Sequence, residues 1–349
     1  MLRAVMVGCG QMSNGWLSAI RETPALAEQV EMAGFVDLDP AVAAGRAAEH
    51  GFADAPAGDD LAAMLEAVRP DVVFDLVVPP ARRGVVETAF AHGCDVLSEK
   101  PMANSMAEAE ALLALARSQG RLHAIVQNRR HLPGIRLIKA LIDSGELGQI
   151  TGLHADFFLG PHFGGFREEM DHVLLLDMAI HTFDAARFLL PSEPVGVYCQ
   201  ESNPAGSWYA HGASANALFD CADGSVFSYR GSWCAEGAPT SWESGWRITG
   251  TRGSVLWDGN LQIDGAVRDG DAGFFYPTRP VTLPSVPDLP AEGHAGVILD
   301  FITARREARD PLSVNSDNIR SLAMVFAAIE SAERGQRVSF GPDREAGAA

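Results

Sequence analysis

Cysteines are few in this sequence, and their spacing excludes two kinds of cross-linked fold. The 349 residues contain no CxxC pair and only five widely spaced cysteines: Cys9, Cys94, Cys199, Cys221 and Cys234. An odd number of cysteines at these spacings provides neither a disulfide framework nor a structural zinc site. We therefore expect free thiols and a reducing, cytoplasmic location.

Positive charge and long apolar runs are also scarce. The sequence has 27 Lys and Arg against 45 Asp and Glu, which gives a formal net charge of −18. Such a chain lacks the positive field with which proteins bind nucleic acid or anionic membrane surfaces non-specifically. No apolar run reaches the roughly 18 residues of a membrane span, and the first apolar strand begins too close to Met1 for a secretory signal. We expect neither a nucleic-acid partner nor a membrane partner.

The first 128 residues alternate between patterns typical of buried strands and patterns typical of helices. Short β-rich runs, with helical stretches between them, cover residues 2–7, 30–36, 71–78, 95–98 and 122–127. Repeated strand–helix–strand units with short connections favour a doubly wound parallel sheet, the Rossmann arrangement. We predict an α/β protein whose first domain, residues 1–128, binds NAD.

The pattern changes after residue 150, where strands follow one another with few helices between them. Predicted strands cover residues 151–159, 195–200, 213–221, 225–233, 246–249 and 254–257. Consecutive strands favour antiparallel pairing, so we predict that residues 129–349 form a C-terminal α/β domain with a large, mainly antiparallel open sheet. Outside this sheet we predict a long helix at residues 174–190 and a loop at residues 270–290. Two late helices, residues 296–306 and 317–334, can pack back on the first domain.

A glycine turn follows the first predicted strand. Gly8 and Gly10 match the first two glycines of G-x-G-x-x-G, whereas Ser13 replaces the third. The first glycine makes the turn and the second lets the backbone approach a pyrophosphate, while serine is small enough for close helix–strand packing. We predict cofactor contacts from Gly8, Gly10, Gln11 and Met12. A lone G-x-G also occurs in ordinary tight turns, and its position in a strand–helix unit is what favours a dinucleotide site here.

Asp37 ends the second predicted strand, where an acid can accept hydrogen bonds from both ribose hydroxyl groups. A carboxylate at this position would repel a 2′-phosphate, and Leu38 offers no cationic partner, so NAD is favoured over NADP. The alternative is that Asp37 or Asp39 only caps the following helix. Val78 and Pro79 end the third strand on the same edge of the sheet, where we expect them to contact the nicotinamide half of the cofactor.

The tripeptide Glu99-Lys100-Pro101 follows the fourth predicted strand, again at a carboxyl end. A lysine there can hydrogen-bond a substrate hydroxyl and stabilise a developing alkoxide. Pro101 would fix the backbone as it leaves the strand, and a cis peptide bond before Pro101 is one way to do this. We predict that Glu99 and Lys100 also contact the cofactor. The alternative is a surface lysine that pairs with Glu99.

Asp177 and His181 lie four residues apart within an otherwise apolar predicted helix, so they share one face. Burying two ionisable groups among leucines is costly unless they pair or face a cavity. A lone helical histidine is more often a packed core residue, but an acid one turn earlier and the presence of Lys100 favour catalysis. His181 is the natural general base because its pKa lies near the operating pH. Asp184 is interpreted as structural.

Potential metal ligands are dense in this region, yet their spacing matches no common zinc site and no HExxH motif occurs: His162, Asp171, His172, Asp177 and His181. We therefore expect no metal. The glycine-rich loop before the helix contains His162 and Arg167, which are candidate substrate contacts, although a solvated loop is an equal alternative. Trp233 is a further candidate, since aromatic rings stack on sugars. Most tryptophans after residue 200 also suit a sheet face that packs on another subunit.

These features together resemble the glucose–fructose oxidoreductase / inositol dehydrogenase family (Gfo/Idh/MocA) over nearly the whole chain. The likeness rests on the glycine turn, Glu99-Lys100-Pro101, Asp177-x-x-x-His181 with Asp184, and segments 129–133 and 317–335. The resemblance implies a Rossmann domain, a second α/β domain with a large open sheet, and homodimers or homotetramers formed through that sheet. It also implies NAD(P)-dependent oxidation of sugars or cyclitols, with Lys100, Asp177 and His181 matching the family's catalytic residues.

We therefore predict an NAD-dependent dehydrogenase that oxidises a secondary hydroxyl of a sugar, cyclitol or related polyol. One alternative is an enzyme that uses transient oxidation by NAD for elimination or glycosidic cleavage, without net NADH. The other alternative is a catalytically silent protein that senses NAD and binds partners. Intact Lys100, Asp177 and His181 argue against the silent protein, because such a protein needs no general base.

Overall fold

The computed structural model describes residues 1–341, which form two compact units. The first unit combines residues 1–132 with residues 289–319, and the second combines residues 133–288 with residues 320–341. Each unit therefore contains a segment from late in the chain. No helix among the described residues is long and apolar enough to cross a membrane.

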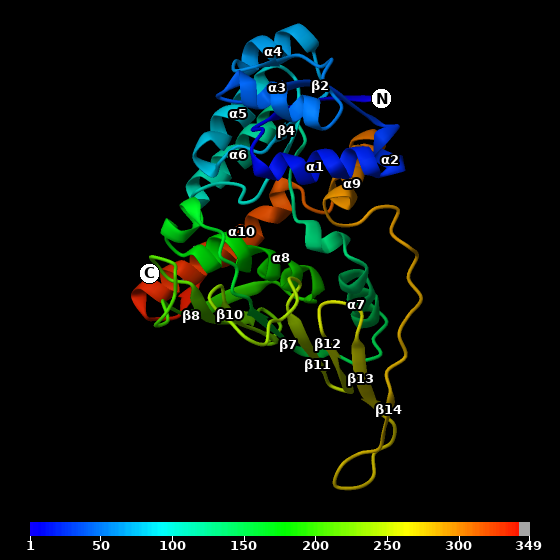
Figure 1. Cartoon of the computed structure of the whole chain (residues 1–349). Coiled ribbons are helices and arrows are strands. Elements are labelled where there is room, and N and C mark those ends of the chain that lie inside the picture. The colour runs from blue at the N-terminus through cyan, green and yellow to red at the C-terminus, as the bar shows by residue number, and fades with distance from the viewer. Residues whose placement is uncertain (342–349) are drawn as a thin grey trace. The chain divides into compact units, whose positions relative to one another are not determined.

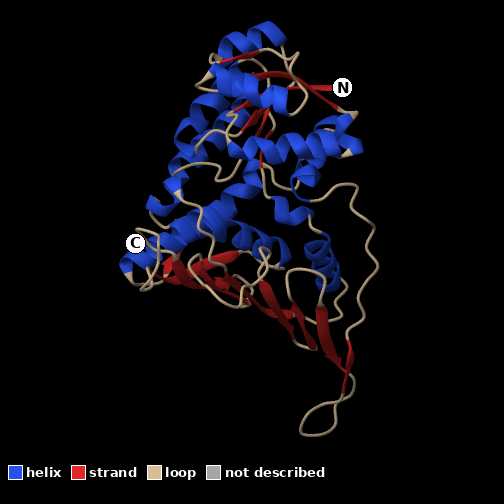
Figure 2. Ribbon diagram, viewed as in Figure 1, coloured by secondary structure: helices blue, strands red, loops and turns tan. Residues whose placement is uncertain are grey.

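The first unit contains a six-stranded sheet, as described, in the order β3-β2-β1-β4-β5-β6. Every strand pair is parallel, which confirms the predicted doubly wound arrangement. The central strands are buried on both faces, as expected where helices cover both sides (Figures 1 and 2). The strands are β1 (Leu2–Val7), β2 (Val30–Val36), β3 (Ala57–Gly58), β4 (Val72–Asp75), β5 (Asp95–Ser98) and β6 (His123–Ile125).

Local signals set the ends of several helices in this unit. Asp39 caps α3 by accepting a hydrogen bond from Ala41 N at 2.9 Å, with Pro40 at the first helical position. Ser105 caps α6, and Gly120 ends it in the left-handed conformation. The helices are α1 (Gln11–Glu22), α2 (Pro24–Ala27), α3 (Pro40–Glu49), α4 (Leu61–Val68), α5 (Pro79–Ala91), α6 (Met106–Gln119), η1 (Asn128–His131) and α9 (Gly293–Glu307).

Helix α9 comes from the second half of the chain but packs into the core of the first unit. Ile298 and Phe301 are fully buried in one cluster with Trp16, Phe35 and Phe74. Full burial of such side chains contributes about 1.5–3 kcal/mol each. The core of the first unit therefore depends on residues nearly 300 positions apart in sequence.

The second unit contains, within residues 1–341, a nine-stranded sheet in the order β14-β13-β12-β11-β7-β10-β9-β8-β15. The pair β7–β10 is parallel and the other pairs are antiparallel, which confirms the predicted mainly antiparallel sheet. The strands are β7 (Ile150–Phe158), β8 (Pro194–Ser202), β9 (Ser214–Cys221), β10 (Val226–Ser232), β11 (Gly245–Gly250), β12 (Gly253–Trp257), β13 (Ile263–Arg268), β14 (Thr278–Pro280) and β15 (Val338–Ser339).

Helices lie along one face of this second sheet (Figure 2). On that face Phe183 contacts the rings of Phe219 and Tyr229 at 4.9 and 5.2 Å between centroids, so the sheet and helix share an aromatic core. The opposite face exposes about half of Tyr198 and Leu218. The helical elements are α7 (Pro133–Asp143), η2 (Gly165–Glu169), η3 (Leu174–Ala179), α8 (Ile180–Leu189) and α10 (Asn315–Arg334).

Two predicted elements of the second unit were wrong in detail. The region 270–290 is not only a loop, because β14 pairs there with the unpredicted strand β13; short edge strands rich in Pro and Gly leave little periodic signal. The predicted helix 174–190 is a π-helix, η3, followed by α8. A π-turn holds one residue more than an α-turn, and hydropathy does not distinguish the two.

Candidate active site

The glycine turn of the first unit lies between β1 and α1. Gly8 has φ +88°, and a Cβ there would lie 2.8 Å from the carbonyl carbon of Leu76 and 2.9 Å from the nitrogen of Val77. Backbone atoms cannot give way, so only glycine fits. Ser13 is fully buried, and its hydroxyl donates to Gly10 O at 2.5 Å. Serine at the third position of the motif is therefore accommodated without an unpaired polar group.

Gly10 is the N-cap of α1 and makes no side-chain cap. A Cβ on Gly10 would meet no atom within 4 Å, so packing within the protein does not require glycine at this position. Amide groups at a helix start that no side chain caps form a site for a phosphate group. The start of α1 therefore has the open space and the donors that the pyrophosphate of a dinucleotide needs.

Asp37 links the end of β2 to the glycine turn. Its Oδ2 accepts the backbone N–H of Cys9 at 2.7 Å, and its Oδ1 accepts that of Asp39 at 3.3 Å. The cap of α3 is Asp39, so the alternative that Asp37 merely caps this helix is wrong. Arg46, which no sequence pattern indicated, donates from Nε to Cys9 O at 3.2 Å.

Three large apolar side chains are exposed at segments that follow strands or open helices of this sheet. Met12, Leu38 and Val78 are 43%, 98% and 63% exposed. Exposed apolar groups beside an uncapped helix start fit a ligand that carries aromatic rings next to its phosphates. The turn, the acid and these side chains together fit a dinucleotide.

Two glycine substitutions separate folding from cofactor binding. In Gly8→Ala the new Cβ collides with the backbone of Leu76, so we expect a lower melting temperature and NAD affinity reduced by at least tenfold. In Gly10→Ala the Cβ enters open space, so we expect a melting temperature within about 2 °C of wild type, which corresponds to about 0.5 kcal/mol in the free energy of unfolding. We also expect weaker NAD binding, because the new methyl group occupies the space proposed for the pyrophosphate. Differential scanning fluorimetry and titration with NADH measure the two effects. Equal loss of stability in both variants would contradict this distinction.

Glu99 is a buried carboxylate beside Lys100. Its Oε1 accepts a hydrogen bond from Trp16 Nε1 at 2.7 Å and lies 3.6 Å from His294 Nε2, while Oε2 accepts the backbone N–H of Lys100 at 3.1 Å. Burial raises the pKa of Glu99, but His294, Trp16 and Lys100 outweigh it and hold that pKa below its usual range. An exposed Glu99–Lys100 surface pair is therefore excluded, and the Lys100–Pro101 peptide bond is cis.

Arg82 joins the two loops that follow β4 and β5. This fully buried guanidinium pairs with Asp75 at 2.8 Å, donates to Val77 O at 2.7 Å, and donates to Pro101 O. Burial raises the pKa of Asp75, and the charge of Arg82 and a hydrogen bond from Ser98 oppose that rise. Arg82 therefore fixes both the segment before Val78 and the segment that carries Lys100. An arginine near the start of a helix has no distinctive sequence pattern, so this role of Arg82 could not be predicted.

A buried histidine continues this polar network. His123 Nε2 lies 3.2 Å from Ser98 Oγ, and Nδ1 lies 3.5 Å from Asn315 Nδ2. Burial and the nearby charge of Arg82 lower the pKa of His123 to about 3, so this imidazole is neutral at ordinary pH. It serves the packing of β5 against β6.

In the second unit, Asp177 lies in η3 and His181 in the first turn of α8. Asp177 is 13% exposed, and its Oδ2 accepts a hydrogen bond from Arg167 Nε at 2.9 Å. The structure thus brings together Asp177, predicted as catalytic, and Arg167, predicted as a substrate contact. Lys100 belongs to the first unit.

Aromatic side chains surround this ion pair. The guanidinium of Arg167 lies 5.1 Å from the ring centroid of Phe163 and 5.0 Å from that of Phe166. Trp233 meets Phe163 edge to face at 5.0 Å and is 2% exposed, and its indole nitrogen has no hydrogen-bond partner among residues 1–341. His162 stacks on Trp208 at 3.7 Å. Two of the candidate substrate contacts, Arg167 and Trp233, therefore share the ring of Phe163, whereas His162 stacks on a separate ring.

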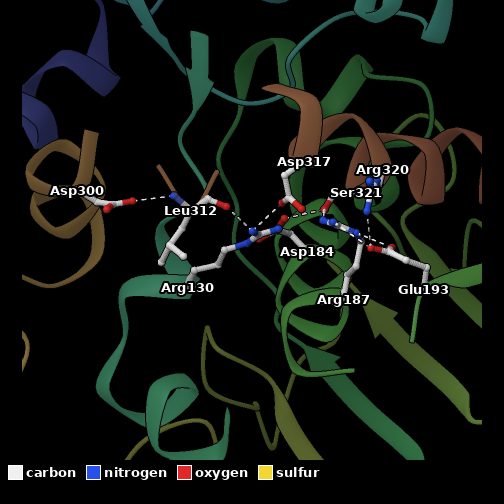
Figure 3. A network of polar contacts seen from close by, with 9 residues as sticks. All are labelled: Arg130, Asp184, Arg187, Glu193, Asp300, Leu312, Asp317, Arg320 and Ser321. Atoms are coloured by element: carbon white, nitrogen blue, oxygen red, sulfur yellow. Dashed lines mark hydrogen bonds and ion pairs between the residues drawn. The ribbon is translucent and has the colours of Figure 1, made fainter. Parts of the chain in front are cut away.

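Helix α8, which carries His181, is bound to α10 by a polar network (Figure 3). Asp184 is fully buried and accepts a hydrogen bond from Ser321 Oγ at 2.6 Å, and Arg187 donates to the same hydroxyl at 3.1 Å. Glu193 pairs with Arg187 at 2.8 Å and with Arg320 at 3.0 Å. This geometry supports the structural interpretation of Asp184.

The late segment of the first unit has its own network in the same view (Figure 3). Arg130 pairs with Asp317 at 2.7 Å and donates to Leu312 O at 2.5 Å. Asp300 accepts the backbone N–H of Leu312 at 2.8 Å. These contacts tie η1 to the first turn of α10 and to the segment that precedes it, and tie that segment to α9.

His172 precedes η3 and has φ +51°, a strained conformation for a residue other than glycine. Its Nδ1 lies 2.5 Å from Glu201 and its Nε2 lies 3.6 Å from Glu333. The hydrogen bond to Glu201 raises the pKa of His172, burial opposes this, and the charges of Glu201, Glu333 and Asp171 add to it. Among residues 1–341, no group of three or more His, Cys, Asp or Glu side chains is arranged to hold a metal ion.

Stability should depend on the charge of His172. Because its pKa is raised on folding, the stabilisation is fully present below the unfolded pKa of about 6.5 and is lost as pH rises through the folded value. We therefore expect the melting temperature of wild type to fall relative to that of His172→Asn between pH 6.5 and 8.5. Thermal scans across that range measure it. A difference that grows with pH would show that the sign is wrong.

A six-stranded parallel sheet with a glycine turn, an uncapped helix start and an acid after β2 defines a dinucleotide-binding Rossmann protein. Two family profiles of one family match the chain: "Oxidoreductase family, NAD-binding Rossmann fold" over residues 2–127 and "GFO/IDH/MocA C-terminal domain" over residues 135–256. The chain belongs to the GFO/IDH/MocA family of NAD-dependent oxidoreductases. This confirms the predicted family, enzyme class and cofactor.

The chain is similar to several dehydrogenases over more than half of its length. It is 24% identical to a D-apiose dehydrogenase of Paraburkholderia graminis, over 97% of this chain and 89% of the relative. It is 30% identical to an inositol 2-dehydrogenase of Streptomyces avermitilis, over 58% of this chain and 57% of the relative. An Agrobacterium radiobacter oxidoreductase, solved with NAD+, L-tartaric acid and magnesium, has the same fold: TM-score 0.84, 21% identity, and coverage of 97% and 98%.

Proposed function

We propose that this protein oxidises a secondary hydroxyl group of a sugar, cyclitol or related polyol. The observation that carries the proposal is the pairing of an NAD-binding Rossmann unit with a second unit in which Asp177 and His181 lie one turn apart and Asp177 pairs with Arg167, which lies over two aromatic rings. The relatives named above act on apiose and inositol, both polyhydroxylated compounds, by their names. NAD, when bound, accepts the hydride; Gly8, Gly10, Gln11, Met12 and Asp37 would hold it, with Val78, Pro79, Glu99 and Lys100 beside the nicotinamide.

The side chains of this chain have distinct roles in the proposal. His181 accepts the proton of the substrate hydroxyl at an imidazole nitrogen. Lys100 donates a hydrogen bond to the same oxygen and stabilises its developing negative charge. Asp177 orients His181 or binds a neighbouring hydroxyl. The buried carboxylate of Glu99 positions the backbone of Lys100 through its 3.1 Å hydrogen bond. His162, Arg167 and Trp233 contact the rest of the substrate.

NAD rather than NADP is the proposed cofactor. The half-buried carboxylate of Asp37 follows β2, and Leu38 beside it is fully apolar and 98% exposed. The negative charge of Asp37 would repel a 2′-phosphate. Arg46 is a nearby positive charge, but its Nε donates to Cys9 O. Side-by-side titration with NADH and NADPH tests this preference, and tighter NADPH binding would refute it.

Residues 1–128 are proposed to bind the cofactor, and residues 129–349 to bind substrate and form a homodimer or homotetramer. The helix-free face of the second sheet supports the interface, since it exposes Tyr198, Leu218 and Leu256 beside the ion pair of Asp156 and Arg230 at 2.5 Å. Light scattering after gel filtration tests the assembly. All five cysteines are free thiols, which supports a location in the reducing cytoplasm.

A substrate screen tests the central proposal. Purified protein, NAD and a panel of sugars, sugar acids and inositols are followed by NADH absorbance at 340 nm. Growth of NADH with at least one compound is the expected result. Consumption of a compound without NADH would favour transient oxidation followed by elimination or cleavage. NADH binding without consumption of any compound would favour the silent sensing protein.

A further inference from the structure

The side chain of Arg167 presents an unused hydrogen-bonding edge beside Asp177. We propose that this edge binds a carboxylate of the substrate, so that the preferred substrate is a sugar acid or another polyhydroxy acid. The inference rests on the proposed function, because it concerns the same site. It adds the chemical class of the compound that the site prefers.

The contacts of Arg167 leave its terminal nitrogens available. Nε donates to Asp177 Oδ2 at 2.9 Å, and within residues 1–341 no other nitrogen of this side chain makes a hydrogen bond. A guanidinium carries five N–H groups in a planar fork, so one carboxylate at Nε leaves the Nη edge for a second. The side chain is 29% exposed, so a ligand can reach it.

Aromatic rings hold the guanidinium in place. Phe163 and Phe166 lie 5.1 and 5.0 Å from its central carbon and are themselves 44% and 64% exposed. Rings at these distances fix the plane of an arginine and reduce the water around it. A carboxylate that enters between exposed rings therefore pairs with a pre-oriented fork at lowered local dielectric, where charged hydrogen bonds are strongest.

The charge balance favours a single carboxylate over a phosphate group. Arg167 already compensates Asp177, and a further monoanion leaves the three groups with one net negative charge. Glu168, which accepts the N–H of Gly164 at 3.0 Å, and Glu236, which lies 3.5 Å from His162, add negative charge to the same loop region. A phosphate dianion would need more cationic partners than these side chains supply.

The position of Arg167 also couples recognition to catalysis. Arg167 bonds Asp177, and Asp177 lies one turn before His181, so a substrate whose carboxylate pairs with Arg167 is held next to the pair proposed for catalysis. A neutral sugar can occupy the region but leaves the Nη edge without a partner. Discrimination against a ligand that lacks the matching polar group is stronger than discrimination by size alone.

Matched substrate pairs test the proposal: D-glucuronate against D-glucose, and D-galacturonate against D-galactose, each also compared with the 6-phosphate of the neutral sugar. For wild type we expect the acid to have a kcat/KM at least tenfold above that of the neutral sugar and of the phosphate. In Arg167→Gln the ratio of acid to neutral kcat/KM should fall by about 10²-fold, the loss of one bidentate charged pair, and Arg167→Lys should restore part of it.

The matched control is Arg268→Gln, since Arg268 also lies over an aromatic ring, Tyr276 at 5.1 Å, and pairs with Asp271 at 3.3 Å, on β13. This variant should keep the wild-type ratio. An equal loss of acid and neutral turnover in Arg167→Gln would mean that Arg167 acts only by holding Asp177, which overturns the proposal. A wild-type preference for the neutral sugar or for the phosphate also overturns it and leaves the dehydrogenase function standing.

A binding measurement keeps the proposal testable if no compound is oxidised, which would refute the proposed function itself. D-glucuronate at millimolar concentration should raise the melting temperature of the wild-type protein without added cofactor, and D-glucose should raise it less. Arg167→Gln should lose the difference between the two. Identical shifts for both sugars in wild type would overturn carboxylate recognition by this site.

Discussion

Replacing His181 by alanine is expected to lower kcat by about 10²–10⁴-fold, the usual contribution of a positioned general base. The variant retains the glycine turn and Asp37, so NADH should bind to it as tightly as to wild type. Steady-state kinetics with the compound found in the screen, together with NADH fluorescence titration, measure the two quantities. Addition of imidazole to His181→Ala should recover part of the activity, as expected for a missing proton acceptor.

Lys100→Met should have a comparable effect for a different reason. Methionine preserves the length of the side chain but removes the charge that would stabilise the substrate alkoxide, so we expect a loss of 10²–10³-fold in kcat, on the scale of one lost oxyanion donor. The chain has a second lysine, Lys139, which pairs with Asp143 on α7. Lys139→Met is the matched control and should keep wild-type kinetics. Near-normal turnover in both Lys100→Met and His181→Ala would remove this mechanism.

The second large effect is expected at Arg82. Arg82→Met leaves Asp75 buried without its counter-ion and frees the carbonyl groups of Val77 and Pro101. Breaking one partner of a buried ion pair costs about 3–5 kcal/mol. We expect the free energy of unfolding of the first unit to fall by that amount, with lower affinity for NADH, because Val77 precedes Val78 and Pro101 follows Lys100.

Two further variants separate the contributions of Arg82. Arg82→Lys keeps the charge beside Asp75 but cannot form all three contacts, so stability should recover more than kcat/KM does. The double variant Asp75→Leu/Arg82→Met removes both charges and should be more stable than Arg82→Met alone. Urea unfolding followed by circular dichroism and steady-state kinetics give the values. An Arg82→Met protein with wild-type unfolding and wild-type kinetics would show that the two loops need no such tie.

Much of the first unit could be predicted from the sequence, because its signals are local. Buried parallel strands appear as short apolar runs, Gly8 and Gly10 appear at the first strand–helix turn, and Asp39-Pro40 is a helix start that depends on neighbouring residues only. The tolerance of Ser13 at the third position of the glycine motif could also be predicted, because a small side chain suffices there. Its hydroxyl donates to Gly10 O, three residues away.

Contacts between distant residues had no such signal. Glu99 reads as the partner of Lys100 in sequence, yet its carboxylate bonds Trp16, which is 83 positions away, and lies beside His294. The burial of Arg82 depends on two loops that only the sheet brings together. The π-helix that carries Asp177 has the same hydropathy as an α-helix and differs by its backbone hydrogen bonds.

The sequence by itself determined most of the strands and helices and the two kinds of sheet, because hydrophobic periodicity and turn residues act over a few neighbours. The tertiary structure alone decided which charges meet: Arg82 with Asp75, Arg167 with Asp177, and His172 with Glu201. An ion pair forms where folding brings two side chains within about 4 Å and removes water from them, and neither condition is written in the spacing of residues along the chain.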